Sequence, residues 1–240
     1  MTADQIAQSG IIFHNQIYMP KIIPADYGGS LFYQATIHLC DGTVLTHSSC
    51  ELNDVDESEL YDRVLALMRN DVLAHNVRPR CDYLDMEKTL QYWKQIGQKN
   101  PIEYLVSACL AGEHCRYDGG SNLVPAIAKL VEDGIAIPVC PEATGGLDTP
   151  RTPCELVKNR VINKDGLDCT EAFQSGALHV CRIAERLGVQ KAVLKQRSPS
   201  CGCGKVYDGT FSGRLIKGDG IAAAMLKKSG LQITTEEDWQ

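Results

Sequence analysis

The sequence lacks any uninterrupted apolar stretch near the length of about 18 residues that a membrane-spanning helix requires. Its first ten residues, MTADQIAQSG, also lack the basic start and the following apolar run of a secretory signal peptide. These two absences predict a cytoplasmic protein that has no membrane partner.

The sequence also lacks an excess of positive charge, because 24 Lys and Arg stand against 30 Asp and Glu, a net charge of -6. Binding to nucleic acid through electrostatics needs clustered Lys and Arg, so this balance argues against it. The acidity is concentrated in residues 1–100, with a net of -5. A local basic patch in the second half would still favour tRNA, and its members would be Lys195, Arg197, Lys205 and Arg214.

No CxxC pair occurs, although the chain has 11 cysteines. Structural zinc often uses such close pairs, and Cys201-Gly202-Cys203 is only a CxC. Disulfides are rare in a reducing compartment, so metal binding or catalysis better explains some of these thiols. Core packing explains others, such as Cys40 in an expected strand and Cys169 and Cys181 in an expected helix.

The chain divides near residue 100 into two differently patterned parts. The polar run QIGQKNP separates them, and the residue before Pro101 is pushed out of the helical region. We expect a small α+β domain in residues 1–100 and a second domain in residues 101–240. The role of the first domain is open between a contact in a homodimer, a lid over substrate and a specificity module.

Local patterns in the first domain predict a hairpin followed by two helices. Apolar residues alternate on both sides of the turn Asp41-Gly42, and apolar residues at helical spacing follow. The expected elements are strands over residues 31–39 and 43–47 and helices over residues 56–74 and 85–96, the first of them capped by Asp56.

From Pro101 onward, short apolar runs alternate with helical patterns. Expected strands cover residues 103–108, 134–139, 191–195 and 231–234, and expected helices cover residues 122–133, 168–187 and 219–228. Alternation of this kind with apolar strands is typical of a parallel sheet covered on both faces. The predicted fold class is therefore α/β, a three-layer parallel sheet with helices on both faces, plus the smaller α+β domain.

Three cysteines stand at equivalent points of the second domain. Cys109, Cys140 and Cys201 each lie at or just past the carboxyl end of an expected strand. Those ends form the ligand crevice of an open parallel α/β sheet, so thiols far apart in sequence would meet at one edge. Irregular loops rich in turn-forming residues surround each cysteine, and such loops free backbone N–H groups to face a ligand.

Three thiolates without an obvious fourth ligand suit a [4Fe–4S] cluster whose fourth iron stays open. An open iron is a Lewis acid with affinity for soft sulfur. A zinc-bound or metal-free α/β domain is the alternative. Cys115 or Cys203 would be a substitute ligand or a sulfur relay, although packing near the ligand loops explains both of them, and Cys154, more simply.

Four dispersed motifs resemble the thiouracil desulfurase (TudS-like) family. They are SACLAGEHCRYDGG (107–120), PVCPEATGGLDTPRTPCE (138–155), RSPSCGCG (197–204) and GIAAAMLKKSGLQITTEED (220–238). The resemblance covers about residues 102–238, and the first 100 residues lie outside it. Because several separated motifs match in order, the resemblance is specific.

The resemblance implies a [4Fe–4S] cluster that is held by Cys109, Cys140 and Cys201. Its unique iron would take the sulfur of a thiolated uracil-type base. Glu142 resembles the family's catalytic acid/base and Ser198 its active-site serine, with Ser200 as a neighbouring candidate. Arg151 and Asp118 would shape the pocket or contact the base, or else form a mutual salt bridge.

The function that follows from this resemblance is a desulfurase that converts C=S to C=O without net redox change and releases sulfide. Its partner would be a small-molecule thiolated pyrimidine, either a free base or a nucleoside. Two alternatives stay open, namely a desulfidase acting on 4-thiouridine in tRNA and a non-catalytic iron–sulfur protein that senses redox state or carries electrons.

Overall fold

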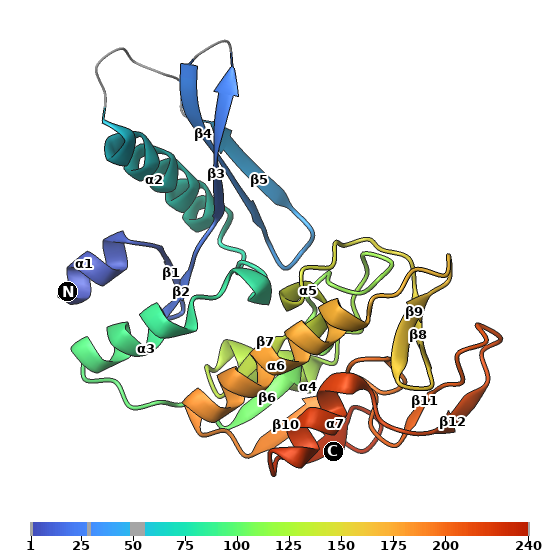
Figure 1. Ribbon diagram of the computed structural model, residues 1–240. Coiled ribbons are helices and arrows are strands. Elements are labelled where there is room, and N and C mark those ends of the chain that lie inside the picture. The colour runs from blue at the N-terminus through green and yellow to red at the C-terminus, as the bar shows by residue number, and fades with distance from the viewer. Residues whose placement is uncertain (1, 28–29, 49–55, 240) are drawn as a thin grey trace. The chain divides into compact units, whose positions relative to one another are not determined.

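The computed structural model describes residues 2–27, 30–48 and 56–239 (Figure 1). The chain forms two compact units, Met1–Lys99 and Asn100–Gln240. Across the described parts of the chain, no helix is both long and apolar enough to cross a bilayer.

The main sheet of the first unit is antiparallel, with strand order β3-β4-β5. Its strands are β3 (Lys21–Tyr27), β4 (Ser30–His38) and β5 (Val44–Ser48). Apolar residues on one side of β4 are buried in a core that they share with helix α2 (Glu57–His75). This arrangement follows from the alternation in β4, because a period of two places Tyr33, Ala35 and Ile37 on the same side.

The hairpin between β4 and β5 confirms the turn expected at Asp41-Gly42, where Gly42 has a φ of 93°. Helix α2 begins directly after Asp56 as expected, but the Asp56 carboxylate makes no capping hydrogen bond to the first turn. Asp85 does cap its helix, because its carboxylate accepts a hydrogen bond from the Lys88 N–H at 2.9 Å.

The remaining elements of the first unit are short. They are α1 (Ala3–Gln8), the antiparallel pair β1 (Ile11–Phe13) and β2 (Gln16–Tyr18), the 3₁₀ helix η1 (Cys81–Tyr83), and α3 (Met86–Gln95). Trp93 of α3 donates its indole N–H to the Asn15 carbonyl at 2.7 Å, which ties this helix to the β1–β2 turn.

The second unit is built on four parallel strands in the order β13-β10-β6-β7. Figure 1 labels three of them, β10, β6 and β7. The four strands are β6 (Tyr104–Ser107), β7 (Ala136–Val139), β10 (Lys191–Leu194) and β13 (Gln232–Thr235). Each lies within one or two residues of an expected strand. The strands in the middle of the sheet are buried because helices cover them, which is why they read as continuous apolar runs.

The helices of the second unit are α4 (Pro125–Glu132), α5 (Pro141–Thr144), α6 (Thr170–Leu187) and α7 (Ile221–Lys228). The crossover through α4 runs from β6 to β7, and the crossover through α7 runs from β10 to β13, in the opposite direction along the sheet. Right-handed crossovers in opposite directions place their helices on opposite faces. Helices α6 and α7 pack against each other. The sheet is thus flanked by helices, which confirms the predicted fold class.

Helix α4 starts at Pro125, three residues later than expected. Proline at the first helical position restricts the residue before it to an extended conformation, and Val124 has φ -115° and ψ 109°. The preceding segment instead bonds to the 3₁₀ helix η2 (Ala108–Ala111), with the Asn122 N–H donating to the Cys109 carbonyl at 2.9 Å. Asn122 is therefore a loop residue that lies beside a candidate ligand.

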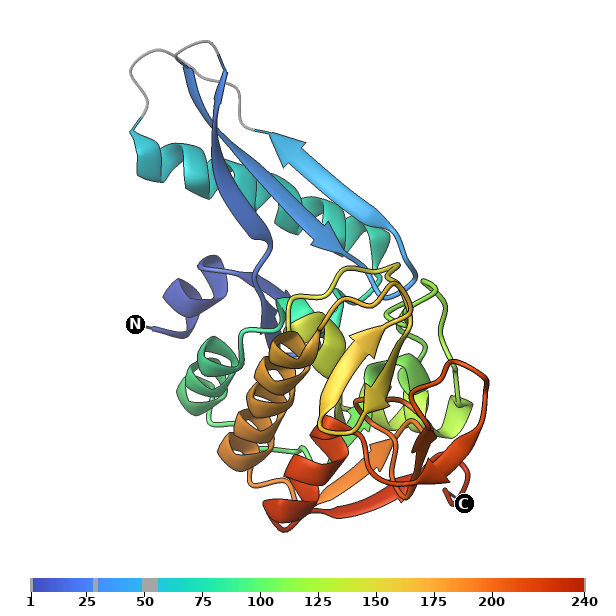
Figure 2. The same ribbon diagram turned by 45° about the vertical axis from the view of Figure 1, so that its right-hand side comes forward.

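Two antiparallel hairpins in the second unit were not anticipated from the sequence. One joins β8 (Cys154–Val157) to β9 (Arg160–Asn163), and the other joins β11 (Lys205–Tyr207) to β12 (Leu215–Lys217). Strand β11 lies beside β8, so the hairpins are neighbours in space (Figure 2). Residues from both hairpins line the cavity described below.

Candidate functional site

The three candidate cysteine ligands line one cavity of about 510 Å³, which we call the cysteine cavity. Cys109 lies in η2 directly after β6, Cys140 immediately precedes α5 after β7, and Cys201 lies in the turn that follows β10. Their exposed fractions are 9%, 9% and 6%. The structure therefore brings together three thiols that are dozens of residues apart in sequence.

The sheet topology explains this meeting. Strands β10, β6 and β7 are consecutive neighbours, and all three are parallel, so their carboxyl ends share one edge. The chain leaves β6 in one direction along the sheet and β10 in the other, which makes the β6–β10 boundary a topological switch point. Such a boundary opens a crevice at the carboxyl ends of the strands, where ligands bind in open α/β sheets.

Burial dominates the electrostatics of two of the three thiols. It raises the pKa of Cys109 to about 12, and the charge of Cys140 adds to the effect. Burial also raises the pKa of Cys201 well above its usual value, with smaller contributions from Cys140 and Cys109. The Cys140 pKa is lowered by a hydrogen bond with the Cys115 side chain, against the effect of burial. Three thiolates so placed repel one another, and bound cations would offset that repulsion.

The donor atoms of the cysteine cavity are chiefly thiols. Among residues 2–27, 30–48 and 56–239, no three His, Cys, Asp or Glu side chains gather closely enough to hold one ion. The three thiols nevertheless face the same space and act on one another electrostatically. Three thiols on one cavity wall suit a group that is bound through several sulfurs.

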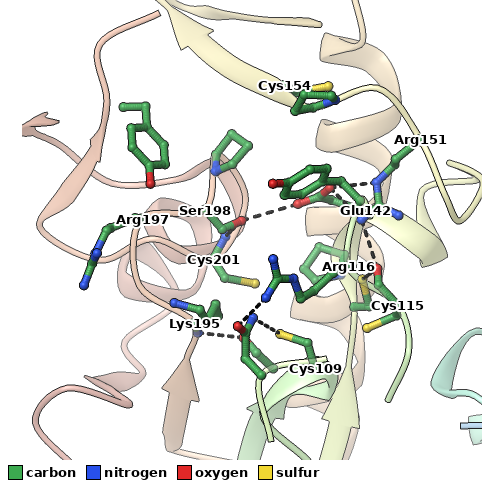
Figure 3. A pocket seen from close by; sticks show the side chains of 18 of the residues that line it. Cys109, Cys115, Arg116, Glu142, Arg151, Cys154, Lys195, Arg197, Ser198 and Cys201 are labelled. Atoms are coloured by element: carbon green, nitrogen blue, oxygen red, sulfur yellow. Dashed lines mark hydrogen bonds and ion pairs between the residues drawn. The ribbon is translucent and has the colours of Figure 1, made fainter. Parts of the chain in front are cut away.

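Glu142 and Ser198, the two candidate catalytic residues, lie together on the cavity wall (Figure 3). The Ser198 hydroxyl donates to Glu142 Oε1 at 3.3 Å. Arg151 donates from Nε and Nη2 to Glu142 Oε2 at 2.9 and 2.8 Å. The carboxylate is thus held at both oxygens, beside the residues that surround the three sulfurs.

The mutual salt bridge considered for Arg151 and Asp118 is wrong. Arg151 pairs with Glu142, whereas Asp118 pairs with Arg116 at 2.8 Å. The backbone explains the first pairing, since the Arg151 N–H donates to the Tyr117 carbonyl at 2.7 Å and fixes the arginine beside the cavity. The charge of Glu142 raises the pKa of Arg151 against the effect of its burial.

Ser198, rather than Ser200, is the serine on the cavity wall. Its hydroxyl oxygen also accepts hydrogen bonds from the backbone N–H groups of Ser200 and Cys201, at 3.0 and 3.1 Å, so it shapes the turn that carries the third thiol. The Ser200 side chain is fully buried, and its hydroxyl has no hydrogen-bond partner among the described residues.

Two of the three additional cysteines line the cysteine cavity, namely Cys115 and Cys154. Cys115 is buried, whereas Cys154 and the third, Cys203, are half-buried. Burial raises the pKa of Cys154 to about 12, and the neighbouring Cys169 adds to this. Cys115 and Cys154 thus share the cavity wall with the three candidate ligands.

Three further residues that line the cysteine cavity were not singled out in the sequence analysis, namely Asn122, Glu155 and Phe211. Asn122 donates from Nδ2 to the Cys109 sulfur at 3.8 Å. Phe211 lines the cavity with a φ of 56°, a left-handed conformation that is uncommon for an aromatic residue. Buried Glu155 holds it there, because one carboxylate oxygen accepts from the N–H groups of Gly209 and Phe211 at 2.9 and 3.0 Å. The run YDGTFSG signals a turn, but only the fold brings it to the cavity.

Acidic residues lie beside three members of the basic patch that would favour tRNA. Lys195 pairs with Glu236, and Arg197 pairs with Glu237. Arg214 lies 3.9 Å from Asp208. Three of the four cations of the expected patch therefore have a carboxylate beside them.

The second unit is similar to known proteins. The 2-thiouracil desulfurase family model matches residues 104–238. A Bacillus subtilis (strain 168) protein, described as uncharacterized protein YbbK, is 38% identical over 144 aligned residues, covering 56% of this chain and 95% of that protein. A solved structure described as [4Fe-4S]-dependent thiouracil desulfidase TudS is 39% identical with a TM-score of 0.54, covering 56% of this chain and 91% of that chain.

Proposed function

Because this chain belongs to the 2-thiouracil desulfurase family, we propose that it removes sulfur from a thiouracil-like base or nucleoside and releases it as sulfide. Residues 101–240 would carry this activity. The observation that supports it best is the cysteine cavity itself, where three buried thiols share a wall with Glu142 and Ser198.

The proposed cofactor is a [4Fe–4S] cluster held by Cys109, Cys140 and Cys201, with one iron that has no protein ligand. Support comes from the donor set of three thiols and from the description of the similar TudS structure as [4Fe-4S]-dependent. When bound, such a cluster supplies a Lewis-acidic iron with affinity for soft sulfur. The protein contributes the thiols, a largely buried setting and the polar groups around the reacting carbon.

The proposed reaction is a hydrolysis. Water adds its oxygen to the thiocarbonyl carbon, the bond between carbon and sulfur breaks, and sulfur leaves as sulfide with no change of oxidation state. Glu142 would accept a proton from the water as it attacks. Ser198 and Arg151 hold this carboxylate at its two oxygens, so it needs little reorientation during the reaction.

The substrate class that we propose is a small thiolated pyrimidine. A cavity of about 510 Å³ falls in the range of small-molecule sites, and it has space for a base or a nucleoside. The aromatic rings of Tyr117, Tyr207 and Phe211 contribute to its wall and offer faces on which a pyrimidine ring can stack. The paired cations described above weigh against tRNA as the substrate.

Anaerobic purification with iron and acid-labile sulfide analysis, followed by a sulfide-release assay, tests this function. The assay would compare 2- and 4-thiouracil, 4-thiouridine and tRNA containing 4-thiouridine, with Cys109→Ala as the variant that lacks a ligand. We expect a cluster in the wild type and sulfide release from the small substrates. Sulfide from tRNA alone would favour the tRNA activity, a cluster without turnover would favour a redox or sensor protein, and absence of iron would refute the proposal.

A further inference from the structure

Three polar side chains form a hydrogen-bonded chain that ends on the Cys109 sulfur. Asp118 Oδ2 accepts from Arg116 Nη2 at 2.8 Å, and Arg116 Nη1 donates to Asn122 Oδ1 at 2.6 Å. Asn122 Nδ2 then donates to the Cys109 Sγ at 3.8 Å. Figure 3 shows the last two links between the labelled side chains of Arg116 and Cys109. The contacts connect an exposed carboxylate to a buried candidate ligand.

The arginine determines which end of the Asn122 amide faces the sulfur. A guanidinium has only N–H donors, so the amide group that meets it must be the carbonyl oxygen. The NH₂ end therefore points to Cys109. Arg116 is itself fixed by its carboxylate partner and by a backbone hydrogen bond from its N–H to the Gly120 carbonyl at 3.2 Å.

Backbone hydrogen bonds hold Asn122 beside the loop that carries Cys109. Its N–H donates to the Cys109 carbonyl at 2.9 Å, and the next hydrogen bond joins Val124 N–H to the Leu110 carbonyl at 2.8 Å. These two backbone hydrogen bonds join the segment of Asn122 to the segment of Cys109. The contact between the Asn122 amide and the Cys109 sulfur is therefore supported by the backbone.

The three candidate ligands differ in their immediate polar neighbours. Cys109 has the amide of Asn122 as its donor, Cys140 is hydrogen-bonded with the Cys115 side chain, and Cys201 is hydrogen-bonded with the Ser107 side chain. Hydrogen bonds to ligand sulfurs withdraw charge from an iron–sulfur group and so shift its potential. Partners of ligands also keep those ligands oriented for binding.

We propose that Asn122 is an outer hydrogen-bond donor to the Cys109 ligand sulfur, which raises the reduction potential of the bound cluster and slows its loss. Arg116 is a positioning residue that fixes the orientation of the Asn122 amide. This inference rests on the proposed function, because it requires that Cys109 hold the cluster.

The test compares wild type with Asn122→Leu, which has a similar volume and no donor, and with Arg116→Lys, which cannot hold the amide in the same way. Asn159→Leu is the matched control, since Asn159 is exposed in the turn between β8 and β9. After anaerobic reconstitution, each protein would be measured for iron and acid-labile sulfide content, for reduction potential and for the rate of cluster loss to a chelator.

We expect Asn122→Leu to have a lower reduction potential and to lose its cluster about 10-fold faster than wild type, as for the loss of other outer partners of ligands. Arg116→Lys should shift both quantities in the same direction by less, and Asn159→Leu should match wild type. If Asn122→Leu does not fold, as judged by circular dichroism, the Arg116→Lys comparison decides the matter.

Wild-type potential and loss rate in a loaded Asn122→Leu protein would overturn the inference while leaving the proposed function intact. So would an unchanged Arg116→Lys protein where it alone can be measured. Failure of the wild type to bind iron would instead refute the proposed function. The two failures are distinguished by the iron analysis of the wild type, which precedes the comparison.

Discussion

At the scale of residues, the side chains around the three thiols are held by partners that lie far away in the sequence. Glu142 is held by Ser198, 56 positions away, as well as by the nearer Arg151. Phe211 is held in its left-handed conformation by Glu155, across the two neighbouring hairpins. Side chains fixed in this way lose little freedom when a substrate binds, which favours both affinity and catalysis.

Replacing Glu142 by Gln tests the proposed proton transfer. The amide has nearly the same shape but accepts no proton, so we expect kcat for sulfide release to fall by about 100-fold or more. Iron content should stay at the wild-type value. Glu171→Gln, at an exposed position in the first turn of α6, is the control. Turnover that survives in Glu142→Gln would refute the role of this carboxylate.

Replacing Phe211 by Ala tests whether the ring stacks on the pyrimidine. Base stacking on an aromatic ring contributes about 1–3 kcal/mol, so KM for 4-thiouracil should rise by about 10-fold. The effect on kcat should be smaller, and Phe211→Tyr should keep most of the affinity. Steady-state kinetics on the three proteins measure this, and an unchanged KM in Phe211→Ala would exclude the stacking contact.

At the scale of elements, the part of the site that could be predicted is the part that local patterns determine. Apolar runs mark the strands, and the irregular loops after them mark where Cys109, Cys140 and Cys201 emerge. Parallel order then brings those loops to one edge whatever the detailed packing. The fold class and the meeting of the three thiols follow from this reasoning, and the structure agrees with both.

The contacts between loops could not be predicted, because they depend on packing between distant segments. The pairing of Arg151 with Glu142 depends on a backbone hydrogen bond to the Tyr117 loop. The late start of α4, which leaves Asn122 free to reach Cys109, depends on a proline that also fits an ordinary helix start. Both hairpins have short strands with weak alternation, so their signal in the sequence is small.

The contact between α5 and α6 depends on the absence of a side chain. A Cβ atom at Gly176 of α6 would lie 1.7 Å from the Pro141 carbonyl oxygen of α5. Gly176→Ala should therefore push α5 away and destabilise the second unit by about 1–3 kcal/mol, as overpacking does. Because α5 carries Glu142, kcat should fall as well.

Thermal unfolding of Gly176→Ala beside Ser175→Ala measures this effect, since Ser175 is exposed on the same helix. We expect the Tm of Gly176→Ala to fall by several degrees and that of Ser175→Ala to stay near wild type. Equal Tm values for the two variants would show that α5 and α6 adjust without cost, contrary to the close approach of their backbones.

At the scale of the whole molecule, the site lies entirely within one of the two compact units. Every residue that lines the cysteine cavity falls between Ser107 and Gly213. The similarity to the Bacillus subtilis protein covers 95% of that protein and only 56% of this chain. The Bacillus subtilis protein is therefore little longer than the 144 aligned residues, which is about the size of the second unit.

A fragment comprising residues 100–240 should therefore fold, bind iron and release sulfide from 4-thiouracil. We expect its kcat to lie within about 3-fold of that of the intact chain, since no residue that lines the cavity is removed. Circular dichroism and the sulfide assay on both proteins check this. A folded, iron-loaded fragment without activity would show that residues 1–99 take part in turnover.

The position of the three cysteines on loops after neighbouring strands has a consequence for the dynamics of the cofactor-free protein. A group bound to all three sulfurs cross-links loops that the chain itself connects only through long crossovers. Without that cross-link, amide hydrogens in these loops should exchange with solvent faster. Those in the buried halves of β6, β7 and β10 should stay protected, so isotope labelling would outline the region that the cofactor rigidifies.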